Sequence, residues 1–114
     1  MIKSPDNMRK AQVEGPRGGE GIVEFTYILE TEEMADSCTM FARLYLHPGA
    51  SVGEHSHTED AEVYYILTGT LEADDNGTIK TVGPGDVIYT GDGAYHSIRN
   101  VGEQTAEMLA VILT

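Results

Sequence analysis

The 114-residue sequence has few basic residues and one cysteine, and it lacks any long hydrophobic run. Seven lysines and arginines stand against 19 aspartates and glutamates, which gives a formal net charge of −12. Nucleic acids and anionic membranes bind basic surfaces, so this balance argues against both as partners. No apolar run reaches the roughly 18 residues that a membrane-spanning helix needs, so we expect no such segment.

Other absences bear on processing and redox state. The N-terminal MIKSPDNMRK has no apolar stretch, so we expect no signal peptide. Cys38 is the only cysteine, which excludes an internal disulfide and fits a reducing compartment. We therefore expect a cytoplasmic protein, long enough for one domain with a real core.

Short strand patterns fill the chain from residue 22 onward, and no segment has a convincing amphipathic helical pattern. Residues 39–47 alternate, with Met40 and Leu44 on one face and Arg43 on the other. Asn76-Gly77 is a strong hairpin signal. The last segment is apolar at consecutive positions, which predicts burial on both faces. The predicted strands are 22–29, 39–47, 62–70, 78–82, 86–90, 95–100 and 106–113.

About seven to nine short strands with frequent turn signals predict an all-β antiparallel sandwich or barrel. We assign this single domain to residues 22–114. Residues 1–21 are polar and end in a glycine-rich stretch. They are expected to form an arm that is either flexible or ordered by pairing with a second subunit.

Three of the four histidines fall in two glycine-framed segments. His55 and His57 are two residues apart, so on a strand they point to the same side. Glu62 follows at an odd spacing, but the polar residues 58–60 between them indicate a turn that resets the alternation. With His96 from a later segment, these side chains predict a site for one divalent metal ion.

The ligand types do not select the metal, because imidazole and carboxylate suit Fe, Mn, Ni, Cu and Zn. A tetrahedral zinc would be saturated by three histidines and one glutamate. A six-coordinate Fe, Mn or Ni would keep two positions open for a substrate, water or dioxygen.

The two segments resemble the motifs of the cupin family. In the first motif the matching residues are Gly49, His55, His57, Glu62 and Gly69. In the second they are Gly85, Gly93, His96 and Asn100, while Gly91 stands where the family usually has proline.

This resemblance implies a double-stranded β-helix, or jelly-roll barrel, with the metal inside. It also implies frequent homodimers, often joined through N-terminal strands. The glycine at position 91 frees a turn that proline would fix, without removing a metal ligand.

Two further residues are candidates for a role beside the metal. If Glu62 points inward, Tyr64 does too, so Tyr64 either presents a hydroxyl near the metal or packs in the core. Arg43 either binds a substrate carboxylate or lies on the outer face of its strand or at a dimer contact.

Two functions remain open from the sequence. The first is a metal-dependent enzyme of the dioxygenase, decarboxylase, isomerase or lyase type that acts on a sugar or an organic acid. The second is a non-catalytic module that binds or senses a small ligand and has a structural metal. The sequence does not choose between them, because a fold does not fix a function.

Overall fold

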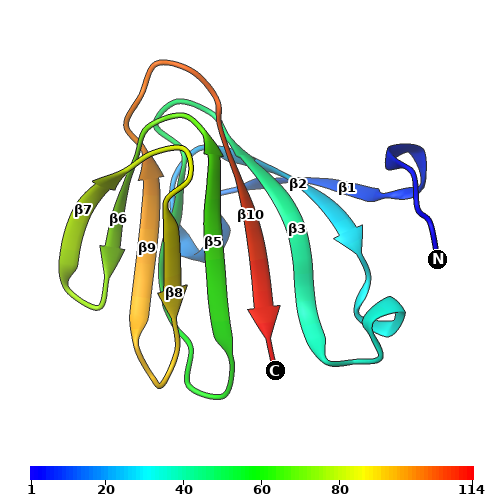
Figure 1. The fold of residues 1–114 in the computed structure, drawn as a ribbon. Helices are drawn as coiled ribbons and strands as arrows, with labels where there is room; N and C mark the ends of the chain where they lie inside the picture. Colours follow the sequence, from blue (N-terminus) through cyan, green and yellow to red (C-terminus); the bar gives the residue numbers. More distant parts are fainter.

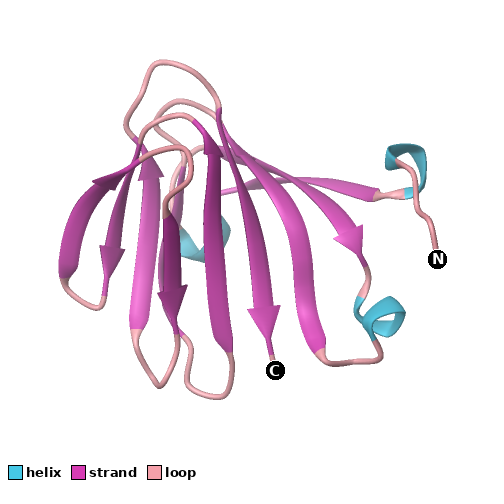
Figure 2. Ribbon diagram, in the orientation of Figure 1, coloured by secondary structure: helices cyan, strands magenta, loops and turns pink.

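The computed structural model describes residues 1–114 and consists almost entirely of strands (Figure 1, Figure 2). The strands are β1 (Arg9–Glu14), β2 (Ile22–Leu29), β3 (Cys38–Leu46), β4 (Ser51–Ser56), β5 (Ala61–Thr68), β6 (Leu71–Asp75), β7 (Thr78–Val82), β8 (Val87–Thr90), β9 (Tyr95–Asn100) and β10 (Ala106–Leu113). Three short 3-10 turns accompany them: η1 (Pro5–Asn7), η2 (Pro16–Gly18) and η3 (Thr31–Met34). The all-β prediction is confirmed.

The strands form two antiparallel sheets that pack face to face as a sandwich. One sheet has six strands in the order β1-β2-β3-β10-β5-β8, and the other has four in the order β4-β9-β6-β7. No hydrogen-bonded strand pair joins the two sheets, so the predicted jelly roll is open along its edges. None of the helical segments is long and apolar enough to cross a membrane.

The core lies between the sheets and is filled by alternate residues of each strand. On β3 these are Ala42, Leu44 and Leu46, and they meet Ile98 of β9 and Met108 of β10 in one buried cluster. Each buried leucine or isoleucine stabilises the fold by about 1.5–3 kcal/mol. The alternation predicted for residues 39–47 is therefore confirmed.

The prediction for the last strand was wrong on one face. Ala106, Met108 and Ala110 are buried, but Leu109 and Val111 on the other face of β10 are only half-buried. The outer face of the six-stranded sheet has no second layer in this chain, because the four-stranded sheet covers only the inner face.

The N-terminal arm is ordered within the chain. Strand β1 pairs with β2 from Arg9↔Tyr27 to Glu14↔Ile22, which makes it the edge of the six-stranded sheet. Figure 1 shows β1 reaching away from the body of the sandwich toward the N-terminus. The loop that follows β1 returns to the sandwich through η2 and lies against β4.

The hairpin predicted at Asn76-Gly77 joins β6 and β7. Both residues have positive φ angles, 51° and 95°, as a two-residue hairpin turn of this kind requires. The Gly77 N–H also donates to Asp74 Oδ1 at 2.9 Å. The hairpin prediction is confirmed.

Candidate metal centre

Four side chains from both sheets meet inside the sandwich. His55 lies on β4, His57 directly follows that strand, and His96 lies on β9. His55 and His96 are cross-strand partners in the four-stranded sheet, whereas Glu62 comes from β5 of the six-stranded sheet. The bend at 58–60 carries the chain between the sheets, so Glu62 joins the histidines despite its odd spacing. The sequence-based expectation of a turn there is confirmed.

The potential ligand atoms of these residues gather around one point. The Nε2 atoms of His55, His57 and His96 lie 3.3, 3.1 and 2.9 Å from Glu62 Oε1. His96 Nε2 is 3.0 Å from His55 Nε2 and 3.1 Å from His57 Nε2. Metal–nitrogen bonds of about 2.0–2.1 Å place neighbouring ligand atoms of one ion about 3 Å apart. The cluster could therefore hold a metal ion.

The hydrogen bonds behind the imidazoles support the same conclusion. His57 Nδ1 lies 2.7 Å from Asp60 Oδ1, and His55 Nδ1 lies 2.7 Å from the Gly53 carbonyl oxygen. Both oxygens only accept, so the neutral rings carry their protons on Nδ1 and turn the lone pairs of Nε2 toward the cluster. Two lone pairs and a carboxylate that face one another this closely are stabilised by a shared cation, and a divalent ion would satisfy them together.

The cluster is almost closed to solvent. The side chains of His57, His96 and Glu62 are 2–3% exposed, and that of His55 is 10% exposed. Burial has the largest single effect and raises the pKa of the Glu62 carboxyl, but the close imidazoles of His55, His96 and His57 together outweigh it and lower the pKa to about 2. Glu62 is therefore ionised at neutral pH and supplies a negative charge to the site.

His96 is held mainly by packing. Its Nδ1 is buried without a hydrogen-bond partner, and its ring stacks on Tyr64 with centroids 4.7 Å apart and planes 6° from parallel.

Gly91, in the place of the usual proline, begins a turn closed by the Ala94 N–H, which donates to the Gly91 carbonyl oxygen at 3.0 Å. Gly91 is not one of the four residues of the cluster.

A cavity of about 230 Å³ adjoins the cluster. His55, Glu62 and Tyr64 line it, as does Arg17 of η2. The other lining residues are apolar: Val13, Pro16, Phe25, Met40, Leu44, Val52 and Ile112. The cluster thus lies beside a mostly apolar cavity, and Arg17 is the only arginine or lysine in the cavity lining.

Tyr64 lies where the sequence predicts, on the inward face of β5. Its side chain is buried and lines the cavity. Burial and the charge of Glu62 raise the pKa of Tyr64 well above its usual range. The hydroxyl therefore keeps its proton at neutral pH.

Arg43 is not brought to the cluster. It lies on the outward face of β3, where its Nη2 donates to Glu107 Oε2 at 2.9 Å and its guanidinium lies 5.5 Å from the Tyr45 ring centroid. The structure therefore places Arg43 in the second of its two predicted positions, on the outer face of the sheet.

Arg17 is a candidate that our sequence analysis missed. It lies in the glycine-rich stretch of the arm, flanked by Pro16 and Gly18. A single cation among glycines and proline, which favour fixed turns, was the available signal. Its proximity to the cluster depends on how the loop packs on β4, which no local pattern reveals.

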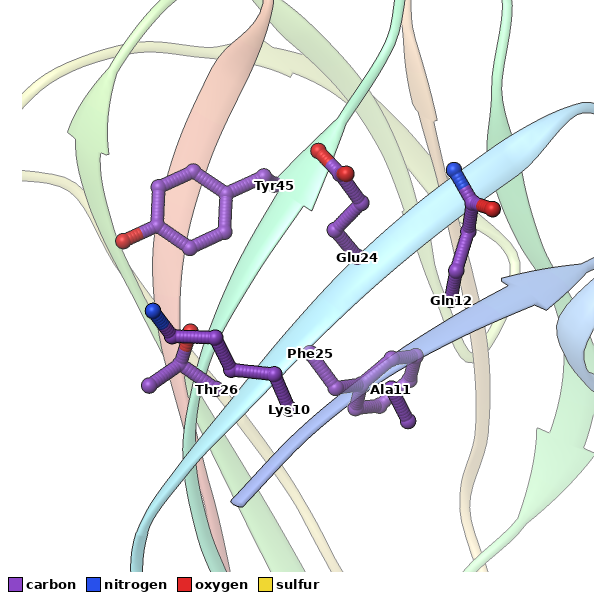
Figure 3. A pocket seen from close by; sticks show the side chains of 7 residues that line it. All are labelled: Lys10, Ala11, Gln12, Glu24, Phe25, Thr26 and Tyr45. Carbon is purple, nitrogen blue, oxygen red and sulfur yellow. The ribbon is translucent and has the colours of Figure 1, made fainter. Parts of the chain in front are cut away.

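The largest hollow on the surface is elsewhere. It measures about 440 Å³ and lies over β1, β2 and β3, with none of the four clustered residues in its lining. Figure 3 shows the side chains that surround it, including Lys10, Thr26 and Tyr45. Unlike the smaller cavity, it adjoins no group of potential metal ligands.

Asp60 gives a first test of the metal assignment. Asp60→Ala removes the acceptor that orients His57, and we expect a 10- to 100-fold loss of metal affinity, as is typical for such partners. Competition with a chromophoric chelator measures this affinity. Glu59→Gln is the matched control, because Glu59 is an exposed neighbour with no side-chain hydrogen bond. Equal affinities for the two variants would contradict the orienting role.

Comparisons with known proteins found similarity over most of the chain. A family model described as a cupin domain matches residues 42–112. An oxalate-binding protein of Thermotoga maritima is 40% identical over 113 residues, which cover 99% of this chain and 93% of that protein. A crystal structure described as a predicted oxalate decarboxylase from Thermotoga maritima has a TM-score of 0.94 and 40% identity and covers 99% of this chain and 98% of its own.

A more distant structure supports the fold alone. The cupin domain of Cnp3 from Schizosaccharomyces pombe has a TM-score of 0.73 at 18% identity. The match covers 91% of this chain and 68% of the yeast chain.

Proposed function

Because this chain belongs to the cupin family, we propose that it binds a small organic acid at a metal site formed by His55, His57, Glu62 and His96. The observation that carries this proposal is the convergence of three Nε2 atoms and one carboxylate beside a cavity of about 230 Å³. The Thermotoga relative named as an oxalate-binding protein makes oxalate the first acid to test.

The metal would be Fe, Mn, Ni or Zn, which this ligand set does not distinguish. A bound divalent ion supplies a Lewis-acidic centre that attracts and polarises carboxylate oxygens. The protein holds the four ligand groups in place and excludes water through their burial. Tyr64 would donate a hydrogen bond from its protonated hydroxyl to an oxygen of the acid.

Calorimetric titration of oxalate into the protein tests this function. With Mn(II) loaded, we expect a Kd below about 1 mM, which corresponds to about 4 kcal/mol of binding free energy. After chelation and dialysis, we expect no measurable binding, because the remaining carboxylate of Glu62 repels an anion. Equal binding with and without metal would contradict the proposal, and so would the absence of binding to the loaded protein.

A metal-dependent decarboxylase is the second candidate, favoured by the description of the similar crystal structure. The C–C bond of oxalate would then break to release CO2, and Tyr64 would donate the proton that the remaining carbon needs to become formate. Apart from the cluster residues, the cavity lining has only Tyr64 and Arg17 as ionisable groups, so no free carboxylate or imidazole is available as a base. This favours binding over turnover, and assay of formate from oxalate separates the two.

We also propose that the protein is cytoplasmic and forms a homodimer. The free thiol of Cys38 fits a reducing compartment. Strand β1 is an edge of the six-stranded sheet, and an edge strand has unpaired backbone groups that can join another chain. Light scattering distinguishes a dimer from the 12.4 kDa monomer.

A further inference from the structure

The loop between β1 and β2 fixes Arg17 at the wall of the cavity. The loop is closed by the Gly15 N–H, which donates to the Gly21 carbonyl oxygen at 2.8 Å. It is tied to β4 by the Glu20 N–H, which donates to Ser51 Oγ at 2.9 Å. Pro16 is buried beneath it. These contacts therefore fix the backbone position from which the Arg17 side chain extends.

The loop also makes direct backbone contact with the strand that carries His55. A Cβ atom on Gly53 would collide with the carbonyl oxygen of Arg17, and one on Gly19 would collide with the carbonyl oxygen of Ser51. Glycine at both positions permits this close approach. The Arg17 backbone itself adopts the left-handed conformation, with φ 56° and ψ 33°, which non-glycine residues adopt only where the surroundings hold them.

The side chain of Arg17 has no anionic partner in the chain. Each of the other three arginines, Arg9, Arg43 and Arg99, makes an ion pair with a glutamate. Arg17 makes none, although the chain has 19 acidic residues. Arg17 is exposed to solvent and is one of the residues that line the cavity. An accessible, unpaired guanidinium at such a wall is suited to bind a carboxylate from outside, with two parallel N–H donors.

The apolar residues of the cavity wall indicate what the rest of such an acid, apart from its carboxylate, would consist of. Val13, Phe25, Met40 and Ile112 come from four strands and present apolar surface to the cavity. Oxalate has no apolar carbon to bury against them. An acid with a short hydrocarbon body would remove apolar surface from water on binding, which is favourable.

We propose that Arg17 is the specificity-determining residue of this cavity and that it binds the carboxylate of an organic acid whose hydrocarbon body packs against the apolar wall. This inference rests on the proposed function, because it concerns the ligand of the same site. It narrows the ligand to acids that are larger than oxalate and have a hydrocarbon body, such as short-chain 2-oxo acids.

Titration of Mn(II)-loaded protein with 2-oxopentanoate, its neutral methyl ester and oxalate tests the inference. The unaltered protein is expected to bind 2-oxopentanoate more tightly than oxalate and the ester at least about 10-fold more weakly than the acid. Arg17→Gln is expected to weaken binding of the acid by about 10- to 100-fold, as for a charged hydrogen-bonded pair. Arg17→Lys keeps the charge but loses the paired donors, so its affinity for the acid is expected to lie between those of the unaltered protein and Arg17→Gln.

Lys10→Gln is the matched control, since Lys10 is an exposed cation at the outer hollow of Figure 3 and makes no ion pair. It is expected to bind the acid as the unaltered protein does. The Mn(II) affinity of Arg17→Gln is expected to be unchanged, because Arg17 is not part of the cluster.

The possible failures can be told apart. If the unaltered protein binds none of these acids, the proposed function fails and this inference fails with it. If the unaltered protein binds acids but Arg17→Gln binds them equally well, the function stands and the role of Arg17 is overturned. A loss of Mn(II) affinity in Arg17→Gln, or tighter binding of oxalate than of 2-oxopentanoate, also overturns it.

Discussion

Replacing His57 with alanine is expected to lower the affinity of the protein for a divalent metal by more than about 100-fold. Partners that merely orient a metal-bound histidine contribute 10- to 100-fold, so loss of a ligand itself should cost more. His55, His96 and Glu62 each already contribute their own ligand atom. Asp60, the nearest other carboxylate, lies at Nδ1, on the side of the His57 imidazole that faces away from the cluster, so it cannot take the place of Nε2. Metal competition assays with a chromophoric chelator measure the loss.

The fourth histidine provides the matched control. The side chain of His47 is 44% exposed and pairs with Glu24 at 3.1 Å, and it is not part of the cluster. His47→Ala is therefore expected to keep the affinity of the unaltered protein. Circular dichroism checks that both variants fold. If both variants lost the metal, or neither did, the assignment of His57 as a ligand would be contradicted.

Removing the metal is expected to lower the melting temperature by about 10 °C. An ion present at 100 times its Kd stabilises the folded state by about 2.7 kcal/mol, because the unfolded chain does not form the site. For a domain near this size, each kcal/mol shifts the melting temperature by roughly 4 °C or more. Thermal melts followed by circular dichroism, with and without a chelator, measure the shift.

The source of this stabilisation lies in the buried cluster. Without a cation, three imidazole Nε2 atoms and the Glu62 carboxylate face one another at 2.9–3.3 Å. The double variant His55→Ala, His57→Ala is expected to melt at the same temperature with and without chelator. A chelator effect of equal size in that variant would show that the ion stabilises the fold at some other place.

Much of the fold could be predicted from local sequence patterns. Residues 22–29, 78–82, 95–100 and 106–113 were predicted as strands and form β2, β7, β9 and β10 with the same bounds. Their side chains alternate or are enriched in β-branched and aromatic residues, and turn signals bound them. The parity argument also correctly placed Tyr64 inward beside Glu62.

Strand β1 could not be predicted in this way. Its sequence, RKAQVE, is mostly polar, and only Ala11 and Val13 are partly buried. It is a strand because β2 offers a complete row of backbone partners, so its structure depends on tertiary pairing rather than on its own pattern.

The two arginines show what limited the site prediction. Alternation grouped Arg43 with Phe41 and Tyr45 but did not decide which face of β3 meets the core. Arg17 approaches the cavity only through the backbone contacts of its loop with Gly53 of β4. That contact joins segments more than 30 residues apart in sequence, so neither composition nor a local pattern could predict it.

The metal content of the purified protein tests the central claim most directly. Elemental analysis of protein incubated with Fe(II), Mn(II), Ni(II) or Zn(II) and then desalted should find about one ion per 12.4 kDa chain with at least one of these metals. The double variant His55→Ala, His57→Ala should retain none. An unaltered protein that takes up no divalent ion, or a double variant that takes up as much as the unaltered protein, would contradict the account.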